Sequence, residues 1–420
     1  MILRIIALIF IYACTSLAWF ALGGTVEYRT HQQDNKLRHE VGQLWGAKQV
    51  QVAPKVYYQT TTYYKVERFK DGVTVSEART EVKDHYVPLT GSEVQVDLKL
   101  EHRRKGLLWY PTYTVGFLGK YKITNPTDET RDIYFSFVFP AQWAIYDDFR
   151  FSAGGRQVPE VNLSDGGFAQ AVSVGPRATL LVEVGYVSRG MEEWGYNFGV
   201  NVNQVRDFTL AMTTDFPDMD FPQNTISPSE KRRKDQGWEL VWRFNNLLTG
   251  VEIGLTMPQK LNPGPWVSSV SFSAPISLFL FFFLLFIFTT IRGIKVHPMN
   301  YFFLGAAFFS FHLLLAYLVD HISIHAAFLI SSAVSIALVT TYMRLVVGCR
   351  FAFLEIGISQ FVYLVLFSYT YFFQGYTGLT ITILCVTTLF IVMQVSGRLD
   401  WETVFHKQTT PTSPILQPES

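Results

Sequence analysis

Two histidines and an acidic residue lie close together in the last third of the chain, as Asp320, His321 and His325. Imidazole and carboxylate groups are common ligands of transition metals, and residues four apart share one face of a helix. This spacing would let His321 and His325 bind a metal ion together with a third ligand from elsewhere. A polar turn at the level of the lipid headgroups explains the same residues without a metal, and we expect no metal here.

Other polar side chains interrupt the apolar segments of the same region. His312 stands within one such segment, Glu355 near the start of a later one, and Gln394 near the end of the last. An ionisable group in the hydrocarbon core of a bilayer is costly unless it is paired or hydrated, so His312 and Glu355 are candidate functional residues. The alternatives are hydrogen bonds that pack helices together and, for Glu355, an ion pair with Arg350 or Arg344.

The common catalytic sequence motifs are absent from the chain. It contains no HExxH, no GxSxG, no GxxxxGK[ST] and no GxGxxG between a strand and a helix. We therefore expect neither an enzyme nor a bound cofactor. Any role of the polar residues then depends on the elements that carry them.

Long apolar segments dominate the last third of the chain. From residue 267 to residue 397 the charged side chains stand between or beside these segments, and they are Arg292, Lys295, Asp320, Arg344, Arg350 and Glu355. A helix of about 20 apolar residues crosses the hydrocarbon core of a bilayer with its backbone groups paired internally. The sequence therefore predicts six transmembrane helices, over residues 2–22, 273–291, 301–319, 322–342, 351–373 and 379–395.

The basic residues favour one orientation of these helices, because short cytoplasmic segments retain Lys and Arg. Such residues precede the first predicted helix, separate the second from the third and the fourth from the fifth, and follow the sixth. They are Arg4, Arg292, Lys295, Arg344, Arg350, Arg398 and Lys407. Both termini are therefore predicted to be cytoplasmic, and residues 24–266 are predicted to lie outside the cytoplasm.

The first apolar segment has competing interpretations. We expect residues 1–23 to form an uncleaved signal anchor, because no clean small-x-small cleavage site follows the segment. A cleaved signal peptide is the main alternative, and a lipoprotein signal ending at Cys14 is a weaker one. Each alternative leaves the orientation of the other five helices unchanged.

Residues 24–266 have the pattern of a β-rich domain. Short segments rich in β-branched and aromatic residues recur there and predict an antiparallel, sandwich-like arrangement. The predicted strands are residues 56–66, 94–100, 110–123, 133–139, 178–186 and 208–213. All 3 cysteines, Cys14, Cys349 and Cys385, fall in or beside predicted transmembrane helices. The external domain therefore has no disulfide and must rely on a packed core.

Three local features of this region carry predictions of their own. Residues 28–45 are expected to form a helix, with apolar residues such as Leu37 and Leu44 at helical spacing. Residues 230–235 (EKRRKD) are expected to form a solvated loop, with contact to anionic lipid headgroups or peptidoglycan as the alternative. The proline-rich residues 257–266 are expected to form a rigid linker before the second transmembrane helix.

Three short motifs mark the ends of predicted transmembrane helices: His297-Pro298, Asp320-His321 and Tyr342-Met343-Arg344. Residues 104–114 (RKGLLWYPTYT) and residues 398–401 (RLDW) add a basic-Gly segment and a basic-x-Asp-Trp ending. In these motifs the chain resembles the CreD family of bacterial inner-membrane proteins. The order of one helix, a large external domain and five further helices is similar as well. The similarity is good over the transmembrane helices and loose over much of residues 24–260.

The resemblance implies a role without a mechanism. CreD-like proteins are associated with cell-envelope integrity and with a two-component response to carbon source or envelope stress, and they provide no established catalytic residues. We keep as candidate functional residues the polar groups at or within the predicted helices. They are His297, His312, Asp320, His321, His325, Arg344 and Glu355.

Together these observations predict a polytopic α-helical membrane protein of the bacterial inner membrane. A β-rich, sandwich-like periplasmic domain, residues 24–266, is inserted between the first and second of six transmembrane helices. Residues 267–397 form the five-helix transmembrane domain, and residues 398–420 a disordered cytoplasmic tail. The expected partners are the lipid bilayer and envelope components or other membrane proteins, with no nucleic acid. A transporter or channel that uses polar residues in the helix bundle is the alternative, and the oligomeric state stays open.

Overall fold

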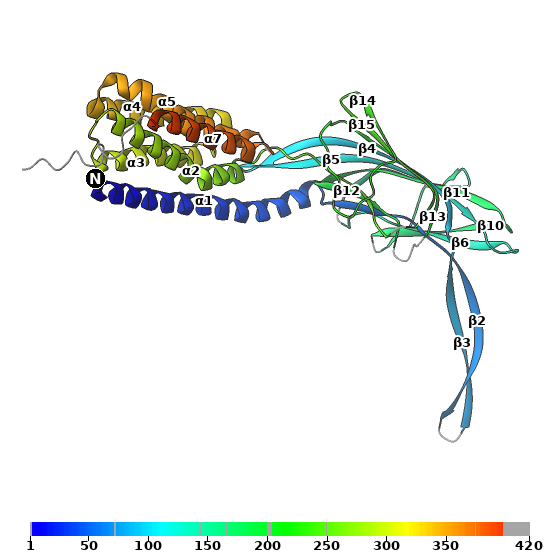
Figure 1. Cartoon of the computed structure of the whole chain (residues 1–420). Helices are drawn as coiled ribbons and strands as arrows, with labels where there is room; N and C mark the ends of the chain where they lie inside the picture. Colours follow the sequence, from blue (N-terminus) through cyan, green and yellow to red (C-terminus); the bar gives the residue numbers. More distant parts are fainter. Residues whose placement is uncertain are drawn as a thin grey trace, which may run out of the picture. The chain divides into compact units, whose positions relative to one another are not determined.

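A computed structural model of the chain describes residues 2–70, 73–142, 144–164, 166–199, 204–248, 250–373 and 375–397. The chain forms two compact units, which we call the helical unit (Met1–Asp34 and Leu261–Ser420) and the β-rich unit (Asn35–Lys260). Figure 1 shows the helices of the first unit and the strands of the second. The predicted tail, residues 398–420, with its RLDW segment and Lys407, lies outside the described residues.

The predicted fold class is confirmed, because six helices are long and apolar enough to cross a membrane. The first is α1 (Ile2–Trp45), and the others are α2 (Pro263–Ile291), α3 (Pro298–Leu318), α4 (Ile324–Val347), a helical run over Phe351–Phe372, and α7 (Thr377–Ser396). The helical run is divided into η1 (Phe351–Ile356), α5 (Gly357–Gln360), η2 (Phe361–Leu366), α6 (Phe367–Tyr369) and η3 (Thr370–Phe372). An apolar core of buried residues from several of these helices holds the helical unit together.

The start of α2 differs from the prediction. We expected a rigid linker over residues 257–266 and a helix from residue 273, but α2 begins at Pro263, with Asn262 as its N-cap. Proline is tolerated in the first turn of a helix, because the N–H groups there have no partner within the helix. Pro263 and Pro265 therefore start the helix rather than delay it.

The helix predicted over residues 28–45 is present as the second half of α1, which runs without a break from Ile2 to Trp45. Within the β-rich unit, Val41 of this helix packs against Leu108, Tyr110 and Met191, with Leu37 beside them. Leu44 is exposed to solvent, so it does not belong to the apolar face that we expected.

The β-rich unit contains three sheets, with the strand orders β1-β12-β16, β3-β2-β6-β10-β9 and β14-β15-β13-β4-β5-β11-β7-β8. The strands are β1 (Gln49–Val52), β2 (Lys55–Lys70), β3 (Val73–Tyr86), β4 (Leu89–Lys105), β5 (Leu108–Thr124), β6 (Arg131–Val138), β7 (Tyr146–Ala153), β8 (Arg156–Gln157), β9 (Leu163–Ser164), β10 (Gly167–Val174), β11 (Thr179–Met191), β12 (Glu193–Asn197), β13 (Val205–Thr214), β14 (Glu230–Lys234), β15 (Gly237–Leu247) and β16 (Ile253–Thr256).

The two larger sheets share an aromatic core, as expected of a sandwich-like domain. Phe117 of β5 lies 6.2 Å, between ring centroids, from Phe137 of β6, and Tyr121 of β5 lies 5.9 Å from Phe135. The sheets are not wholly antiparallel, because β4 pairs with β13 and β1 pairs with β12 in parallel. Each parallel pair joins strands that are far apart in the sequence, and such pairing leaves no local turn signal.

Residues 230–235 do not form the predicted loop. Glu230–Lys234 is the edge strand β14, which pairs with β15 in an antiparallel register. Most of its side chains are exposed, and Lys231 Nζ lies 4.2 Å from the centre of the Trp238 ring. Charged side chains are common on edge strands, because they discourage pairing with a further strand. The strand therefore lacks the apolar alternation by which strands are recognised.

Strands β2 and β3 form a long two-stranded ribbon. They pair from Tyr57 and Tyr86 to Lys70 and Val73, whereas the next strand, β6, pairs only with residues 55–58 of β2. Figure 1 shows this ribbon extending away from the other strands of the β-rich unit. Both faces of its outer part are therefore open to solvent.

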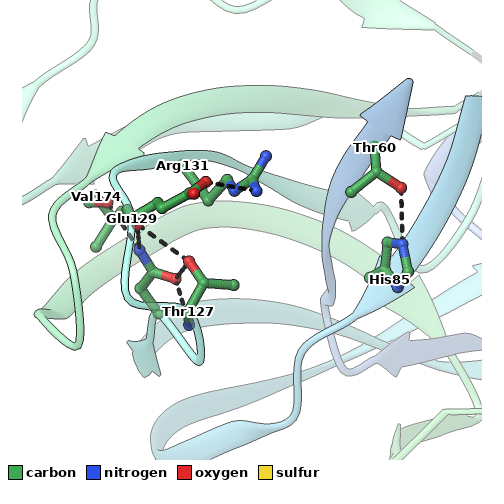
Figure 2. A network of polar contacts seen from close by, with 7 residues as sticks. Thr60, His85, Thr127, Glu129, Arg131 and Val174 are labelled. Carbon is green, nitrogen blue, oxygen red and sulfur yellow. Dashed lines mark hydrogen bonds and ion pairs between the residues drawn. The ribbon is translucent and has the colours of Figure 1, made fainter. Parts of the chain in front are cut away.

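A buried asparagine joins two turns of the β-rich unit. Asn125 Nδ2 donates hydrogen bonds to the carbonyl oxygens of Glu129 (2.8 Å), Val174 (2.9 Å) and Gly175 (2.9 Å). Its Oδ1 accepts hydrogen bonds from the Thr127 backbone N–H (3.0 Å) and the Thr127 hydroxyl (2.8 Å). Figure 2 labels three of the residues in these contacts, Thr127 and Glu129 in the β5–β6 turn and Val174 at the end of β10. One side chain thus fixes the connection between β5 and β6 against the end of β10.

Candidate functional site

Asp320, His321 and His325 do not form the ligand group that their spacing would allow. Helix α4 begins at Ile324, with Ser323 as its N-cap, so His321 lies in the preceding turn and shares no helical face with His325. The Asp320 carboxylate pairs with Arg29 of α1 at 3.1 Å. The His325 ring stacks on Phe372, with centroids 4.8 Å apart. Within the described residues, no three His, Cys, Asp or Glu side chains are grouped as metal ligands would be.

His312 is buried in the helical unit, where it joins α3 to α1. Its Nδ1 donates to the Phe308 carbonyl oxygen at 3.1 Å, so Nε2 carries no proton in the neutral ring. The imidazole lies edge-on to the Trp19 ring at 5.5 Å and beside Phe311 at 4.8 Å. Neither His312 Nε2 nor Trp19 Nε1 has a hydrogen-bond partner among the described residues. The contacts that the structure gives His312 are those of a packing residue.

Small polar side chains link α3, α4 and the helical run that follows. Ser335 of α4 donates to the Ala307 carbonyl oxygen of α3 at 2.7 Å, and Gln360 Nε2 donates to Ser335 Oγ at 3.0 Å. Nearer the other end of these helices, the Tyr342 hydroxyl donates to Asn300 Oδ1 at 2.7 Å. Such bonds between helices replace those that water cannot supply in lipid.

Glu355 has a different partner from the one that we expected. Its Oε1 lies 2.6 Å from a guanidinium nitrogen of Arg292, at the C-terminal end of α2, rather than near Arg344 or Arg350. The side chain of Arg292 is 57% exposed and that of Glu355 only 21%. The pair therefore joins α2 to η1 and neutralises a carboxylate that is largely out of solvent.

Removal of Arg292 should destabilise the protein more than neutralisation of Glu355. Arg292→Ala leaves a largely buried carboxylate without its cation, at a cost of about 1–3 kcal/mol. Glu355→Gln leaves an exposed guanidinium and should cost less than about 1 kcal/mol. Thermal unfolding of the full chain in lipid nanodiscs measures both. Lys295→Ala, at an exposed position between α2 and α3, is the control. Equal midpoints for Arg292→Ala and the unmodified protein would contradict the prediction.

The remaining candidates occupy helix ends. His297 is the N-cap of α3 and accepts a hydrogen bond from the Met299 N–H at 3.2 Å. Arg344 lies in the last turn of α4, where a cation interacts favourably with the helix dipole. Since α3 and α4 are joined by the turn that holds Asp320, the candidates divide between the two ends of these helices. His297 and Arg344 lie at one end, and Asp320, His321 and His325 at the other, so the candidates do not gather in one site.

A cavity in the β-rich unit was not predicted from the sequence. It has a volume of about 500 Å³ and lies where β2, β4, β12 and β13 begin or end. Residues 53–56, 86–89 and 204–206 line it, together with Ser92, Tyr196, Phe198, Gly199 and Phe208. No local motif marks it, because four segments that are distant in the sequence meet there.

Several tyrosines in the core of the β-rich unit are neutral because they are buried. Burial raises the pKa of Tyr113, Tyr121 and Tyr186 well above the ordinary value of 10.0. Burial also raises the pKa of Tyr146 to about 12. The Tyr113 hydroxyl donates to the Glu193 carbonyl oxygen at 2.7 Å, and that of Tyr186 donates to Gln51 Oε1 at 2.8 Å. These hydroxyls therefore serve the core as neutral donors.

The six apolar helices and the β-rich unit define a multi-pass membrane protein with a large domain outside the lipid. The family described as "Inner membrane protein CreD" matches residues 205–402. Over these residues the chain is similar to the CreD family of inner-membrane proteins, and the predicted resemblance is confirmed there. The matched segment covers the last strands of the β-rich unit and five of the helices.

Comparison with curated proteins gives no match. Among solved structures, the chain is similar to a putative nutrient binding protein from Legionella pneumophila, with 10% sequence identity and a TM-score of 0.31. That similarity covers 46% of this chain and 74% of the other.

Proposed function

We propose that the protein supports cell-envelope integrity by binding a glycan strand of the envelope through its β-rich unit, without catalysis of its own. In this proposal the β-rich unit lies in the periplasm. The cluster of Arg292, Lys295, Arg344 and Arg350 at one end of the transmembrane helices supports that orientation, since basic residues favour the cytoplasmic side. The observation that carries the proposal is the tyrosine-rich face of the β2–β3 ribbon.

The tyrosine face consists of Tyr57 and Tyr63 of β2, Tyr86 of β3 and Tyr134 of β6. Alternate residues of a strand share one face, and Tyr57 is directly opposite both Tyr86 and Tyr134. The rings of Tyr57 and Tyr134 stack with centroids 5.2 Å apart, and those of Tyr57 and Tyr86 lie 6.2 Å apart. Tyr63 is 78% exposed and Tyr86 is 72% exposed. Large aromatic rings are therefore available to a partner.

The polar groups of this face suit a partner with hydroxyl groups and little charge. Between Tyr57 and Tyr63 the face carries Gln59 and Thr61 from β2 and Thr80, Val82 and Asp84 from β3. Asp84 is the charged member, and it accepts a hydrogen bond from Gln59 at 3.0 Å. Aromatic rings bind the apolar C–H faces of sugars, while amide and hydroxyl groups bond to their hydroxyls. Tyrosine combines both properties in one side chain.

The edge of the ribbon is less suited to a protein strand. The outer strand β3 carries Arg79, Glu81, Lys83 and Asp84 in sequence, and such charges discourage pairing at a free edge. An isolated two-stranded ribbon is also only marginally stable in water. A partner that lies flat across the tyrosine face would stabilise the ribbon while leaving its charged edge in solvent.

Cosedimentation of the full chain in nanodiscs with purified peptidoglycan sacculi tests this function. We expect Tyr57→Ala combined with Tyr63→Ala to weaken binding about tenfold or more, because the stacking of a sugar on each aromatic ring contributes on the order of 1 kcal/mol. Tyr58→Ala combined with Tyr64→Ala removes the same ring types from the opposite face of the same strand, and should leave binding nearly unchanged.

Two results would overturn the proposal. One is the absence of binding to sacculi above that of empty nanodiscs, and the other is equal loss of binding in the two double variants. Concentration-dependent self-association that is lost with Tyr57 and Tyr63 would assign the face to a second copy of the chain instead.

A further inference from the structure

We infer that the cavity between β2, β4, β12 and β13 binds a small organic anion with an aromatic or aliphatic body. Its volume of about 500 Å³ falls within the range of small-molecule sites, which hold mainly apolar walls and a few polar groups. The cavity lies wholly within the β-rich unit. This inference stands independently of the proposed glycan binding, since most of its residues lie outside the tyrosine face.

The apolar wall of the cavity is built from three aromatic rings. Phe198 and Phe208 are 5.0 Å apart between centroids and nearly perpendicular, and Tyr196 lies 5.7 Å from Phe198 and 5.6 Å from Phe208. All three side chains are buried. Val56 and Val87 add buried aliphatic surface from β2 and the segment before β4. These buried residues back the cavity, and an apolar surface of this kind favours a ligand with an apolar body.

The charged residues that line the cavity are both cations. They are Lys55, at the start of β2, and Arg206, in β13, both exposed to solvent. Among the described residues, no carboxylate lines the cavity with them. Arg206 donates to the neutral Gln204 Oε1 at 3.1 Å, and no acidic side chain is paired with either cation in the part of the chain that is described. A carboxylate, sulfonate or phosphate of a ligand would supply the missing negative charge, because charge-assisted hydrogen bonds are the stronger ones.

The walls are held in place by backbone hydrogen bonds. The Val87 N–H donates to the Val56 carbonyl oxygen at 2.8 Å, and the Ala53 N–H donates to that of Asn197 at 2.8 Å. Asn197 Oδ1 in turn accepts from the Gly199 N–H at 2.7 Å. A cavity whose walls are fixed before binding loses less conformational entropy when a ligand enters.

Isothermal titration of the full chain in nanodiscs with 4-phenylbutyrate and with its neutral analogue 4-phenylbutan-1-ol tests the inference. We expect the acid to bind at least about tenfold more tightly than the alcohol, because the alcohol cannot accept charge-assisted bonds from both cations. Lys55→Gln combined with Arg206→Gln should remove this preference and leave the affinity for the alcohol unchanged. Lys65→Gln combined with Lys99→Gln changes the net charge equally at exposed positions outside the cavity and should preserve the preference.

A second variant tests the location without removing a charge. Ala53→Phe places a ring in the cavity and should weaken the binding of both compounds. Equal affinity for the acid and the alcohol would overturn the assignment of an anion site. Two results would overturn the site itself. One is binding that is unchanged in both Ala53→Phe and the double Gln variant, and the other is no binding beyond that of empty nanodiscs. Binding of the double Gln variant to sacculi is measured in parallel. It shows whether a change in anion binding occurs without a change in glycan binding, so the two proposals can fail separately.

Discussion

Raising the pH from 10 to 12 should unfold the β-rich unit, because its core contains tyrosines that cannot ionise where they lie. Burial holds the pKa of Tyr113, Tyr121 and Tyr186 well above 10.0, and that of Tyr146 at about 12. In the unfolded chain the same phenols ionise near pH 10. Above pH 10, ionisation of these phenols therefore favours the unfolded chain.

The sign of this effect follows from the number of bound protons. Above pH 10 the unfolded state releases phenol protons that the folded state retains, so the free energy of unfolding falls as the pH rises. The contribution of each tyrosine is fully present below pH 10 and is lost between pH 10 and its folded pKa. Each such tyrosine lowers the free energy of unfolding by about 1.4 kcal/mol for each pH unit in this window. Four groups thus remove roughly 5 kcal/mol by pH 11, which is comparable with the whole stability of many domains.

Tyrosinate absorbance and far-ultraviolet circular dichroism, followed together against pH, measure this transition. We expect the buried tyrosines to ionise in one cooperative step, in which absorbance rises as the sheet signal falls. Tyr121→Phe removes one of the four groups and should make stability depend less steeply on pH. Tyr63→Phe, at a position that is 78% exposed, should change nothing. Titration of all tyrosines without loss of the sheet signal would contradict the prediction.

The transmembrane helices were the most predictable part of the fold. Lipid demands a long apolar segment whose backbone bonds are internal, so composition alone locates each helix to within a few residues at most of its ends. The start of α2 was the exception. Its first four residues, 263–266, belong to the predicted linker because that segment is rich in proline, although proline is acceptable in a first turn.

The strands were predictable where they have a buried face or, as in residues 56–66, where β-branched and aromatic residues are frequent. Residues 94–100 and 133–139 alternate between apolar and polar side chains because one side of β4 and β6 packs in the core. Strands β3 and β14 have no such face, so nothing in their charged sequences distinguishes them from loops. The parallel pairing of β4 with β13 was also invisible, since more than a hundred residues separate the partners.

The same limit applies to the candidate site residues. His312 was recognised as an unusual group within an apolar segment, but its contact with Trp19 depends on how α1 packs against α3. Glu355 was assigned to nearby arginines, whereas its partner Arg292 is 63 residues away in the sequence. Motifs and periodicity describe neighbours along the chain. Ion pairs and cavities are made by segments that only the tertiary fold brings together.

Asn125→Asp should destabilise the β-rich unit by about 3 kcal/mol or more, although it changes only one amide nitrogen to oxygen. The Asn125 amide donates to the carbonyl oxygens of Glu129, Val174 and Gly175, all within 2.9 Å, and its side chain is fully buried. An ionised carboxylate has no hydrogen to donate and would face three acceptors. Burying an unpaired charge, or leaving buried acceptors unsatisfied, costs several kcal/mol.

The pH dependence of this variant distinguishes lost donors from simple loss of packing. The new carboxyl group would have a raised pKa in the folded state, since burial and the three carbonyl oxygens oppose its ionisation. A group whose pKa is higher in the folded state contributes most to stability below its pKa in the unfolded chain, which is near 4 for Asp. This contribution to stability is lost as the pH rises. Asn125→Asp should therefore be least harmful at low pH, where the protonated acid can still donate one hydrogen bond.

Urea unfolding of the full chain in nanodiscs at pH 5 and pH 8 measures the change in the free energy of unfolding. Asn245→Asp, at an exposed position of β15, introduces the same charge and should cost less than about 0.5 kcal/mol at both values. Asn125→Ala removes the donors without adding charge. Its loss of stability should lie between those of Asn125→Asp and Asn245→Asp and should not depend on pH. Equal stability of Asn125→Asp and Asn245→Asp at pH 8 would mean that the buried amide does not hold the β5–β6 turn against the end of β10.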